Sequence, residues 1–378
     1  MVDIPTLDIE DYDPDLNEEP ESIEDKSGGA LTYAIVGAGQ GGGRMAKAFY
    51  DMGYTKTIAV NTARSDLNGL DIPEDQKFLV DEHGEQGAGK DQAKAEAAIE
   101  KKEQEVFNKF REVFGTNVDR IMICLGVSGG SGGGTVNTLI KVAKKYFIYI
   151  GVEDVDQRVG VIASLPTAGE SASPTVAKNA HARITQLCGL AEKGQIAPLI
   201  MVDNEKIKKL YPKLTVKKFW TTINNTVAGL FHVFNILANK DSEYTTFDAT
   251  DYDSIMKQPG CMIMGVTSVK NLENETAVSS ALKKNLEKTL LAEGFDLTTA
   301  TGAACIVVGS EEIFEETAGL MDNIEFGFDT LAALTGGAMI HRGIYEDVNK
   351  DKLVTYTLVS GLKRPTKRIE GLKKFLKK

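Results

Sequence analysis

A run of glycine between two apolar segments places the strongest constraint on how this chain can fold. Residues 126–135 read GVSGGSGGGT, so six of the ten positions are glycine. The run follows the apolar segment 121–125 and precedes a helical pattern at 136–146. Because ordering a glycine-rich loop costs backbone entropy, we expect this loop to bring its backbone close to a ligand.

A second glycine cluster, GAGQGGGRM at 37–45, also follows an apolar segment and opens a helical pattern. In a parallel sheet, ligands bind at the carboxyl ends of the strands. Loop N–H groups and helix N-termini attract phosphate there. Two such clusters in one sheet therefore predict a polyphosphate site.

Apolar strand patterns alternate with helical patterns from about residue 31 to residue 202. We expect strands at 32–37, 56–60, 77–80, 120–125, 159–164 and 197–202, with helices that include 91–114, 134–146 and a segment after Pro174. Short apolar strands separated by helices are typical of a parallel sheet covered on both faces. The fold class is therefore predicted to be α/β.

One long helix is predicted over 215–240. Its apolar residues recur at steps of three or four, which places them on one stripe: Val216, Trp220, Ile223, Val227, Leu230, Phe234 and Leu237. Asn225 falls nearly opposite this stripe. After residue 244, strand patterns at 261–269, 303–309, 338–343 and 353–362, with a helix at 275–293, predict a smaller α+β domain.

Charge is concentrated at the two ends of the chain, whose formal net charge is −11. Residues 1–27 hold eleven acids against one lysine, and residues 363–378 hold eight bases against one acid. The acidic end is expected to be a disordered tail, and the basic end is either solvated or in contact with an acidic partner. The domains are thus expected at 1–30 (acidic tail), 31–214 (nucleotide-binding domain), 215–243 (central helix), 244–362 (α+β domain) and 363–378 (basic tail).

The four cysteines form no CxxC pair, so neither a disulfide framework nor a zinc site is indicated. No apolar run approaches the roughly 18 residues of a membrane span, and the N-terminus lacks a signal-peptide pattern. A cytoplasmic protein is expected.

Three classes of phosphate-binding protein compete for the glycine clusters. Gly37, Gly39 and Gly42 fit the G-x-G-x-x-G of a dinucleotide-binding fold, although Asn61 stands where that fold needs an acid. The P-loop pattern fails twice, at 84–91 and at 129–135, because one required residue is missing each time.

The third class accounts for the order of all the pieces, since residues 31–362 resemble the tubulin/FtsZ family of polymerising GTPases. GQGGGRM (39–45), AVNTARSDL (59–67), GAGKD (87–91) and SGGSGGG (128–134) resemble its phosphate loops. Ala63 replaces the family's acid, which removes an expected magnesium contact and leaves the metal ligands unknown. The resemblance implies GTP and Mg²⁺ as ligands and assigns phosphate contacts to Gly39, Gln40, Gly41, Gly42, Arg44, Asn61, Ala88, Gly89, Gly129, Gly130, Ser131, Gly132 and Gly133.

Later loops continue the resemblance toward the nucleoside. SLPTAGE (164–170) resembles the sugar-contacting loop, with Glu170 as the ribose candidate, and VDNEKI (202–207) resembles the next loop, with Asp203. Asn225 matches the guanine-reading asparagine, with Asn224 as the alternative for a one-residue shift. An amide suits guanine because it both donates and accepts hydrogen bonds.

FDATDYDSIM (247–256) resembles the family's catalytic loop and carries Asp-x-x-Asp as Asp248 and Asp251. The family's preceding asparagine is Thr246 here. Two carboxylates can orient a water and accept its proton. The resemblance implies that they act on the nucleotide of the next subunit, so that a head-to-tail homopolymer completes each active site.

Alternatives of other classes remain at this point. An NADP-dependent oxidoreductase would make no use of Asp248 or Asp251, and a non-hydrolysing nucleotide-binding scaffold would fit the substitutions Ala63 and Thr246. The resemblance does not decide between cell division and DNA segregation. The basic tail 363–378 is a candidate surface for an adaptor protein, DNA or an anionic membrane.

Overall fold

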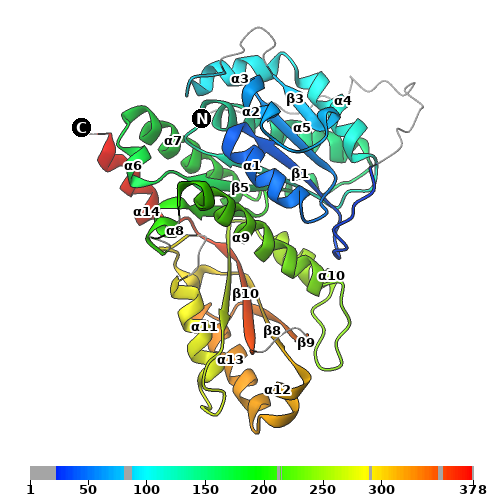
Figure 1. The fold of residues 1–378 in the computed structure, drawn as a ribbon, viewed down its shortest axis with the longest axis vertical. Coiled ribbons are helices and arrows are strands. Elements are labelled where there is room, and N and C mark those ends of the chain that lie inside the picture. The colour runs from blue at the N-terminus through cyan, green and yellow to red at the C-terminus, as the bar shows by residue number, and fades with distance from the viewer. Residues whose placement is uncertain are drawn as a thin grey trace.

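One ten-stranded sheet runs through the whole protein (Figure 1). The computed structural model describes residues 23–80, 87–210, 213, 215–288, 292–347 and 352–376. Residues 1–22 of the expected acidic tail lie outside this part of the chain. The strand order is β3-β2-β1-β4-β5-β6-β7-β10-β8-β9. The prediction of an α/β fold is confirmed.

The strands follow the predicted apolar segments closely. Their bounds are β1 Tyr33–Ala38, β2 Thr57–Asn61, β3 Lys77–Leu79, β4 Arg120–Gly126, β5 Val159–Leu165, β6 Leu199–Asp203, β7 Cys261–Ser268, β8 Gly302–Gly309, β9 Met339–Glu346 and β10 Val354–Leu362. Strands β1 to β6 are parallel, and β6 pairs in parallel with β7 through Leu199–Cys261 and Ile200–Met262. Strand β10 is antiparallel to both β7 and β8. The two halves that the sequence separates thus share one sheet.

Helices cover both faces of this sheet. Their bounds are α1 Gly39–Tyr50, α2 Arg64–Asn68, α3 Gln92–Glu100, α4 Glu103–Phe114, α5 Gly130–Tyr149, α6 Ala168–Ser171, α7 Pro174–Glu192, α8 Asn204–Leu210, α9 Val216–Leu237, α10 Ala249–Met256, α11 Ala277–Lys288, α12 Glu311–Glu316, α13 Leu320–Leu334 and α14 Thr366–Gly371. Across the described residues, no helix combines the length and apolar character that crossing a bilayer requires.

Alternation along β4 shows how the two faces are filled. Ile121, Ile123 and Leu125 pack in one core with residues of α4, α5, α7, α11 and α13. Met122 and Cys124 pack in a second core with residues of α1, α9 and α10. Both sets are buried, as a central parallel strand requires.

Several helices differ from the sequence expectation. The helix expected at 91–114 is two helices, α3 and α4, which meet at Lys101 and Lys102. Helix α5 begins at Gly130, inside the glycine run, rather than at 134. The segment 247–256, expected as a loop, contains the short helix α10, and α13 was not predicted.

The basic C-terminal segment packs back onto the N-terminal half of the molecule. In Figure 1, α14 lies near α6, α7 and α8, which are far from it along the chain. Ile369 and Leu372 are buried in the core that includes α7. Arg364 forms a two-pronged ion pair with Glu192 of α7. The amphipathic pattern of this segment therefore serves packing within the chain.

A buried arginine joins α10 to the start of the central strand. Arg120 is fully buried at the first position of β4. Its Nη1 donates to Asp253 Oδ1 at 2.8 Å, and its Nη2 donates to the carbonyl oxygens of Ala197 at 2.9 Å and Met256 at 2.8 Å. Lys257 and Arg158 also face Asp253, at 2.7 and 3.7 Å.

These partners set the pKa of Asp253. Burial alone would raise it, but the hydrogen bond from Lys257 and the charges of Arg120, Lys257 and Arg158 outweigh burial and hold the pKa below its ordinary value. A depressed pKa means that the folded state prefers the carboxylate more than the unfolded chain does. The ion cluster therefore stabilises the fold at neutral pH and loses this effect in acid.

We predict that Asp253→Asn lowers the free energy of unfolding at pH 7 by about 3 kcal/mol, because Arg120 is left buried without its counter-ion. The difference from wild type should be constant above the unfolded pKa of about 3.9 and shrink as the pH falls through the lower folded pKa. Urea unfolding between pH 7 and pH 3 measures both. A difference that stays the same at pH 3 would contradict this account.

Candidate functional site

A pocket of about 360 Å³ opens where both glycine loops meet, at the carboxyl ends of β1, β4 and β5 and beside α9. Its lining comprises Ala38, Gly39, Gln40, Gly41, Arg44, Asp66, Lys90, Gly126, Ser128, Gly129, Gly130, Ser131, Gly132, Ser164, Pro166, Glu170, Asn204, Trp220 and Asn224. The predicted edge of the sheet is therefore hollowed, and most of the predicted phosphate-loop residues lie on its wall.

Two helix N-termini face this pocket without side-chain caps. Helix α1 follows Ala38 and helix α5 follows Gly129, and neither residue caps its helix with a side chain. The first N–H groups of a helix have no partner within the helix and carry its positive dipole end. The pocket therefore presents two sets of donors suited to an anion.

Close approach of neighbouring segments explains glycines both on the pocket wall and behind it. A Cβ on Gly42 would lie 2.0 Å from the carbonyl oxygen of Cys124, and one on Gly130 would lie 2.9 Å from the backbone of Lys90. Gly42 and Gly133 are buried and do not line the pocket. Gly42 lets α1 lie close against β4, and Gly133 makes room for the side chain of Gln92 at the start of α3.

Lys90 is a pocket residue that the sequence analysis did not assign. Its backbone φ is +69°, which is unusual for a residue other than glycine. Asn179 Nδ2 donates to its carbonyl oxygen at 2.8 Å. Ala88 and Gly89, which were expected to touch phosphate, do not line the pocket, and Ala88 is buried against Gly130. With Arg44, Lys90 gives the pocket two cationic side chains. The lysine in GAGKD was the available signal.

Asp66 supplies a carboxylate near the position that Ala63 leaves neutral. Its Oδ1 accepts from Gln40 Nε2 at 2.9 Å and its Oδ2 accepts from Asn61 Nδ2 at 3.1 Å. Asn61 itself is buried and does not line the pocket, because its side chain bonds to Asp66 and to the N–H of Ala63. The side chain of Asn61 therefore contacts Asp66 instead of facing the pocket.

The residues around Asp66 fit a magnesium ion held mainly by phosphate. Mg²⁺ commonly takes one or two protein carboxylates and the phosphates of its nucleotide. Asp66 provides one carboxylate, and the hydroxyls of Ser131 and Thr62 lie 2.6 Å apart in the adjoining loops. Within the described ranges, no cluster of three or more His, Cys, Asp or Glu could hold a metal without such a ligand.

On the far side of the pocket, α9 presents Trp220 and Asn224. These residues are one helical turn apart and share a face. Asn225, preferred in the sequence analysis, is exposed and lies outside the lining, so the one-residue alternative Asn224 is the α9 asparagine that lines the pocket. Trp220 is half-buried there, whereas Ile223, Val227, Leu230, Phe234 and Leu237 of the same stripe are in the core.

Glu170 lines the pocket, and Asp203 does not. Glu170 Oε2 accepts from the N–H and the hydroxyl of Thr167, at 2.8 and 3.0 Å, in a capping box that opens α6. Asp203 is buried and receives two hydrogen bonds from Arg368, at 2.6 and 2.9 Å. Asp203 is thus occupied by the C-terminal segment rather than directed at a ligand.

Asp248 and Asp251 lie at the opposite end of the sheet from the pocket. They are the N-cap and third residue of α10, and the Asp248 carboxylate accepts from the N–H of Asp251 at 2.9 Å. Helix α10 is joined to Arg120 at the amino end of β4, whereas the pocket lies at Gly126, the carboxyl end. Seven extended residues span about 20 Å. The two aspartates therefore cannot act in the pocket of their own chain.

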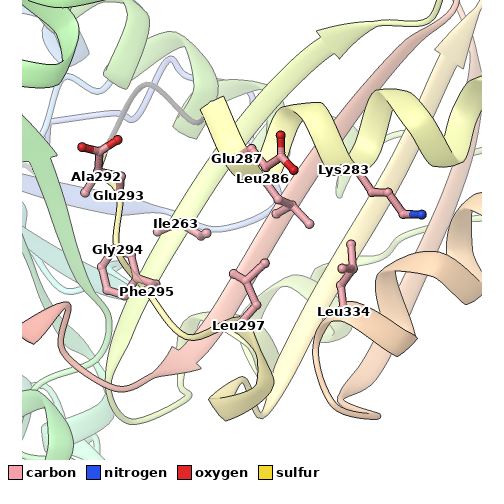
Figure 2. Close-up of a pocket in the computed structure, with 10 residues that line it drawn as sticks. All are labelled: Ile263, Lys283, Leu286, Glu287, Ala292, Glu293, Gly294, Phe295, Leu297 and Leu334. Carbon is pink, nitrogen blue, oxygen red and sulfur yellow. The ribbon is translucent and has the colours of Figure 1, made fainter. Parts of the chain in front are cut away.

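A second hollow of about 310 Å³ lies between α11, β7 and the segment 292–297 (Figure 2). Its wall is mainly apolar, with Ile263, Leu286, Phe295, Leu297 and Leu334, and the charged residues are Lys283, Glu287 and Glu293. Two acids against one base do not favour phosphate. The pocket between the glycine loops is the better candidate.

We predict that Gly129→Asp abolishes binding of a polyphosphate while the fold is retained. Gly129 has φ −72° and ψ 154°, which any residue adopts, and a Cβ there meets nothing closer than 3.5 Å. Aspartate is a favourable N-cap, so stability should rise by a few tenths of a kcal/mol, but its charge occupies the anion site. Gly129→Asn is the neutral control and should retain more binding. Calorimetric titration with a nucleoside triphosphate and thermal unfolding give both quantities, and equal affinity in the two variants would contradict the anion site.

Sequence comparisons point in the same direction as the geometry. Residues 32–212 match the family model described as Tubulin/FtsZ family, GTPase domain. Residues 245–366 match that of Tubulin-like protein TubZ, C-terminal domain. The chain is similar to Cell division protein FtsZ 2 of Halobacterium salinarum, at 26% identity over 335 residues that cover 87% of this chain and 76% of the relative.

Solved structures share the fold. The GTPγS-form protofilament of Bacillus thuringiensis serovar israelensis TubZ aligns with a TM-score of 0.75 at 20% identity, covering 92% of each chain. CetZ2 from Haloferax volcanii, as a GTPγS-bound protofilament, aligns with a TM-score of 0.72 at 19% identity, covering 92% of this chain and 99% of that one. Both halves of the chain match models of the same family, and the glycine loops and the α/β sheet agree with them. This protein belongs to the tubulin/FtsZ family.

Proposed function

We propose that the protein binds GTP in the pocket between the glycine loops, assembles head to tail, and hydrolyses GTP at each contact between subunits. The observation that carries this proposal is the separation of the pocket from Asp248 and Asp251 along β4. Because the pocket and the aspartates lie at opposite ends of one subunit, the site is completed when the aspartates of one copy meet the pocket of the next. Such a heterologous contact generates open filaments.

The pocket lining suggests how GTP lies. The triphosphate meets the N-termini of α1 and α5, with Arg44 and Lys90 as counter-charges. The ribose reaches Glu170, and the base reaches the amide of Asn224 beside the ring of Trp220. When Mg²⁺ is bound, it neutralises phosphate charge, and Asp66 is the residue that would hold it.

The aspartates supply the chemistry on the nucleotide of the neighbouring copy. Phosphoryl transfer needs a positioned nucleophile and charge stabilisation more than covalent help from the protein. Asp251 and Asp248 lie side by side in one helical turn, so they can orient a water molecule and accept its proton.

An exposed apolar side chain lies on β9, the strand that contacts α10. Met339 at the start of β9 is 68% exposed. Strand β9 also carries His341, which contacts Asp251. Methionine is enriched in protein interfaces. The start of β9 therefore fits the contact with the next subunit.

A cytoskeletal role follows from filament formation. The relatives include proteins named for cell division and a structure described as type III plasmid segregation TubZ. We infer that this protein serves one of these two roles, cell division or DNA segregation. In the basic segment, Lys363, Lys367 and Lys374 are exposed, and an adaptor, DNA or anionic membrane would contact these residues.

We predict that Trp220, the single tryptophan of the chain, changes its fluorescence when GTP binds, because the base would stack on its ring. Asn224→Ala should weaken GTP binding roughly tenfold, the value of about one hydrogen bond to a buried polar group. Asn225→Ala, one position along the same helix, is the matched control and should bind like wild type. A loss of affinity in Asn225→Ala alone would reverse the assignment.

Hydrolysis and assembly are tested together with Asp251→Asn, which keeps the shape of the side chain. We expect GTP to raise light scattering in both proteins, and phosphate release to fall about a hundredfold or more in the variant. Filaments of the variant should therefore persist longer. GTP-dependent scattering without phosphate release in wild type would favour the non-hydrolysing scaffold. A melting temperature raised by NADPH and not by GTP would favour the oxidoreductase.

A further inference from the structure

A histidine from the C-terminal half of the sheet contacts the aspartate that the proposed function makes catalytic. His341 lies on β9 with its side chain 14% exposed, and its Nδ1 is 2.8 Å from Asp251 Oδ1. Its Nε2 is 3.2 Å from the hydroxyl of Ser254, one turn further along α10. Both ring nitrogens therefore face α10.

The protons of this cluster can be assigned from its acceptors. The Ser254 hydroxyl donates its one proton to the carbonyl oxygen of Asp251 at 2.8 Å, because a carbonyl can only accept. The Asp251 carboxylate can only accept, so Nδ1–H of His341 donates to it. Nε2 of His341 meets the hydroxyl of Ser254.

His341 holds one carboxylate oxygen of Asp251 and does not contact the other. Oδ1 is held by His341, and Oδ2 lies 3.5 Å from the N–H of Asp248, at the limit of a hydrogen bond. Asp248 is held in turn through its own bond to the N–H of Asp251. The contact with β9 thus restricts the Asp251 side chain, which is 32% exposed. A base that must meet a water on another subunit benefits from such restriction, since a misplacement of about 1 Å can cost a hundredfold in rate.

We propose that His341 is a positioning residue, which orients Asp251 for GTP hydrolysis on the neighbouring subunit; this inference rests on the proposed function. The geometry separates this role from simple stabilisation. Ser254 and Asp251 belong to one short helix that Arg120 already anchors, so the position of α10 does not depend on the contact with His341. The hydrogen bond from Nδ1 is therefore directed at the position of one carboxylate oxygen.

Three substitutions divide the functions of the two ring nitrogens. In His341→Asn, the amide nitrogen takes the position of Nδ1 and can still donate to Asp251. In His341→Gln, the amide nitrogen takes the position of Nε2 and reaches only toward Ser254. His341→Leu donates to neither. His181→Leu is the matched control, because it also removes a mostly buried imidazole. His181 lies on α7, and its Nε2 is 3.7 Å from Glu370 Oε1.

Phosphate release is measured per assembled subunit, with light scattering and the GTP concentration at half-maximal rate measured in parallel. We expect His341→Leu and His341→Gln to release phosphate roughly tenfold to a hundredfold more slowly than wild type, with assembly and half-maximal GTP concentration unchanged. His341→Asn should recover most of the rate, and His181→Leu should match wild type. The Asn and Gln variants have similar size and polarity, so their difference stands even where the Leu variant folds poorly.

Equal rates of phosphate release in His341→Asn and His341→Gln would overturn the positioning role. A loss of assembly that is as large as the loss of hydrolysis would also overturn it. Asp251→Asn, measured beside these variants, distinguishes failure of the proposed function from failure of the positioning role alone. Normal hydrolysis in Asp251→Asn would show that the proposed function itself fails. Slow hydrolysis in Asp251→Asn together with normal hydrolysis in His341→Gln would overturn the positioning role alone.

Discussion

The buried guanidinium of Arg120 fixes the helix that carries the aspartates relative to the sheet that carries the pocket. Its partners come from three segments that are distant in the sequence: Asp253 and Met256 on α10, Ala197 before β6, and Gln157 before β5. A buried charge is costly unless its partners are in place. Displacement of α10 would leave this charge unpaired. The helix therefore has one defined position at the amino end of the parallel strands.

From this constraint follows the division of the site. Parallel strands bring all their carboxyl ends to one edge, and the glycine loops place the pocket at that edge. The same strands bring their amino ends to the other edge, where Arg120 holds α10. A parallel sheet thus separates the two parts of the candidate site by the length of its strands, and a second copy is required to bring them together. The C-terminal segment adds a further tie, because Arg368 bonds both to Asp203 and to the carbonyl oxygen of Pro166 on the pocket wall.

Much of the fold and part of the site could be predicted from local sequence pattern. The family and the α/β class are confirmed, since buried strands and glycine loops at strand ends leave a signal within a few residues. The start of α5 was predicted too late because glycine has a low helix propensity, yet close packing around Gly130 requires it in the first turn. Helix α10 was missed because its sequence, ATDYDSIM, is short and mostly polar.

Other features depend on contacts that no local pattern contains. Asn224 and Asn225 differ by one step of about 100° around α9, and only the placement of that helix against the loops decides which faces the pocket. Lys90, Asp66 and the pairing of Asp203 with Arg368, 165 residues away, belong to the same class. The roles of the site residues in nucleotide binding and hydrolysis stay predictions.

Complementation between two defective variants tests the central claim most directly, because it asks whether pocket and aspartates act from different subunits. Gly129→Asp would remove the nucleotide while leaving α10 intact, and Asp251→Asn would bind nucleotide without the base. Each alone should release little phosphate from GTP. A mixture should recover a substantial part of the wild-type rate, since the Asp251 of one variant meets the GTP held by the other. A mixture that co-assembles but hydrolyses no faster than the sum of its components would contradict a site shared between subunits.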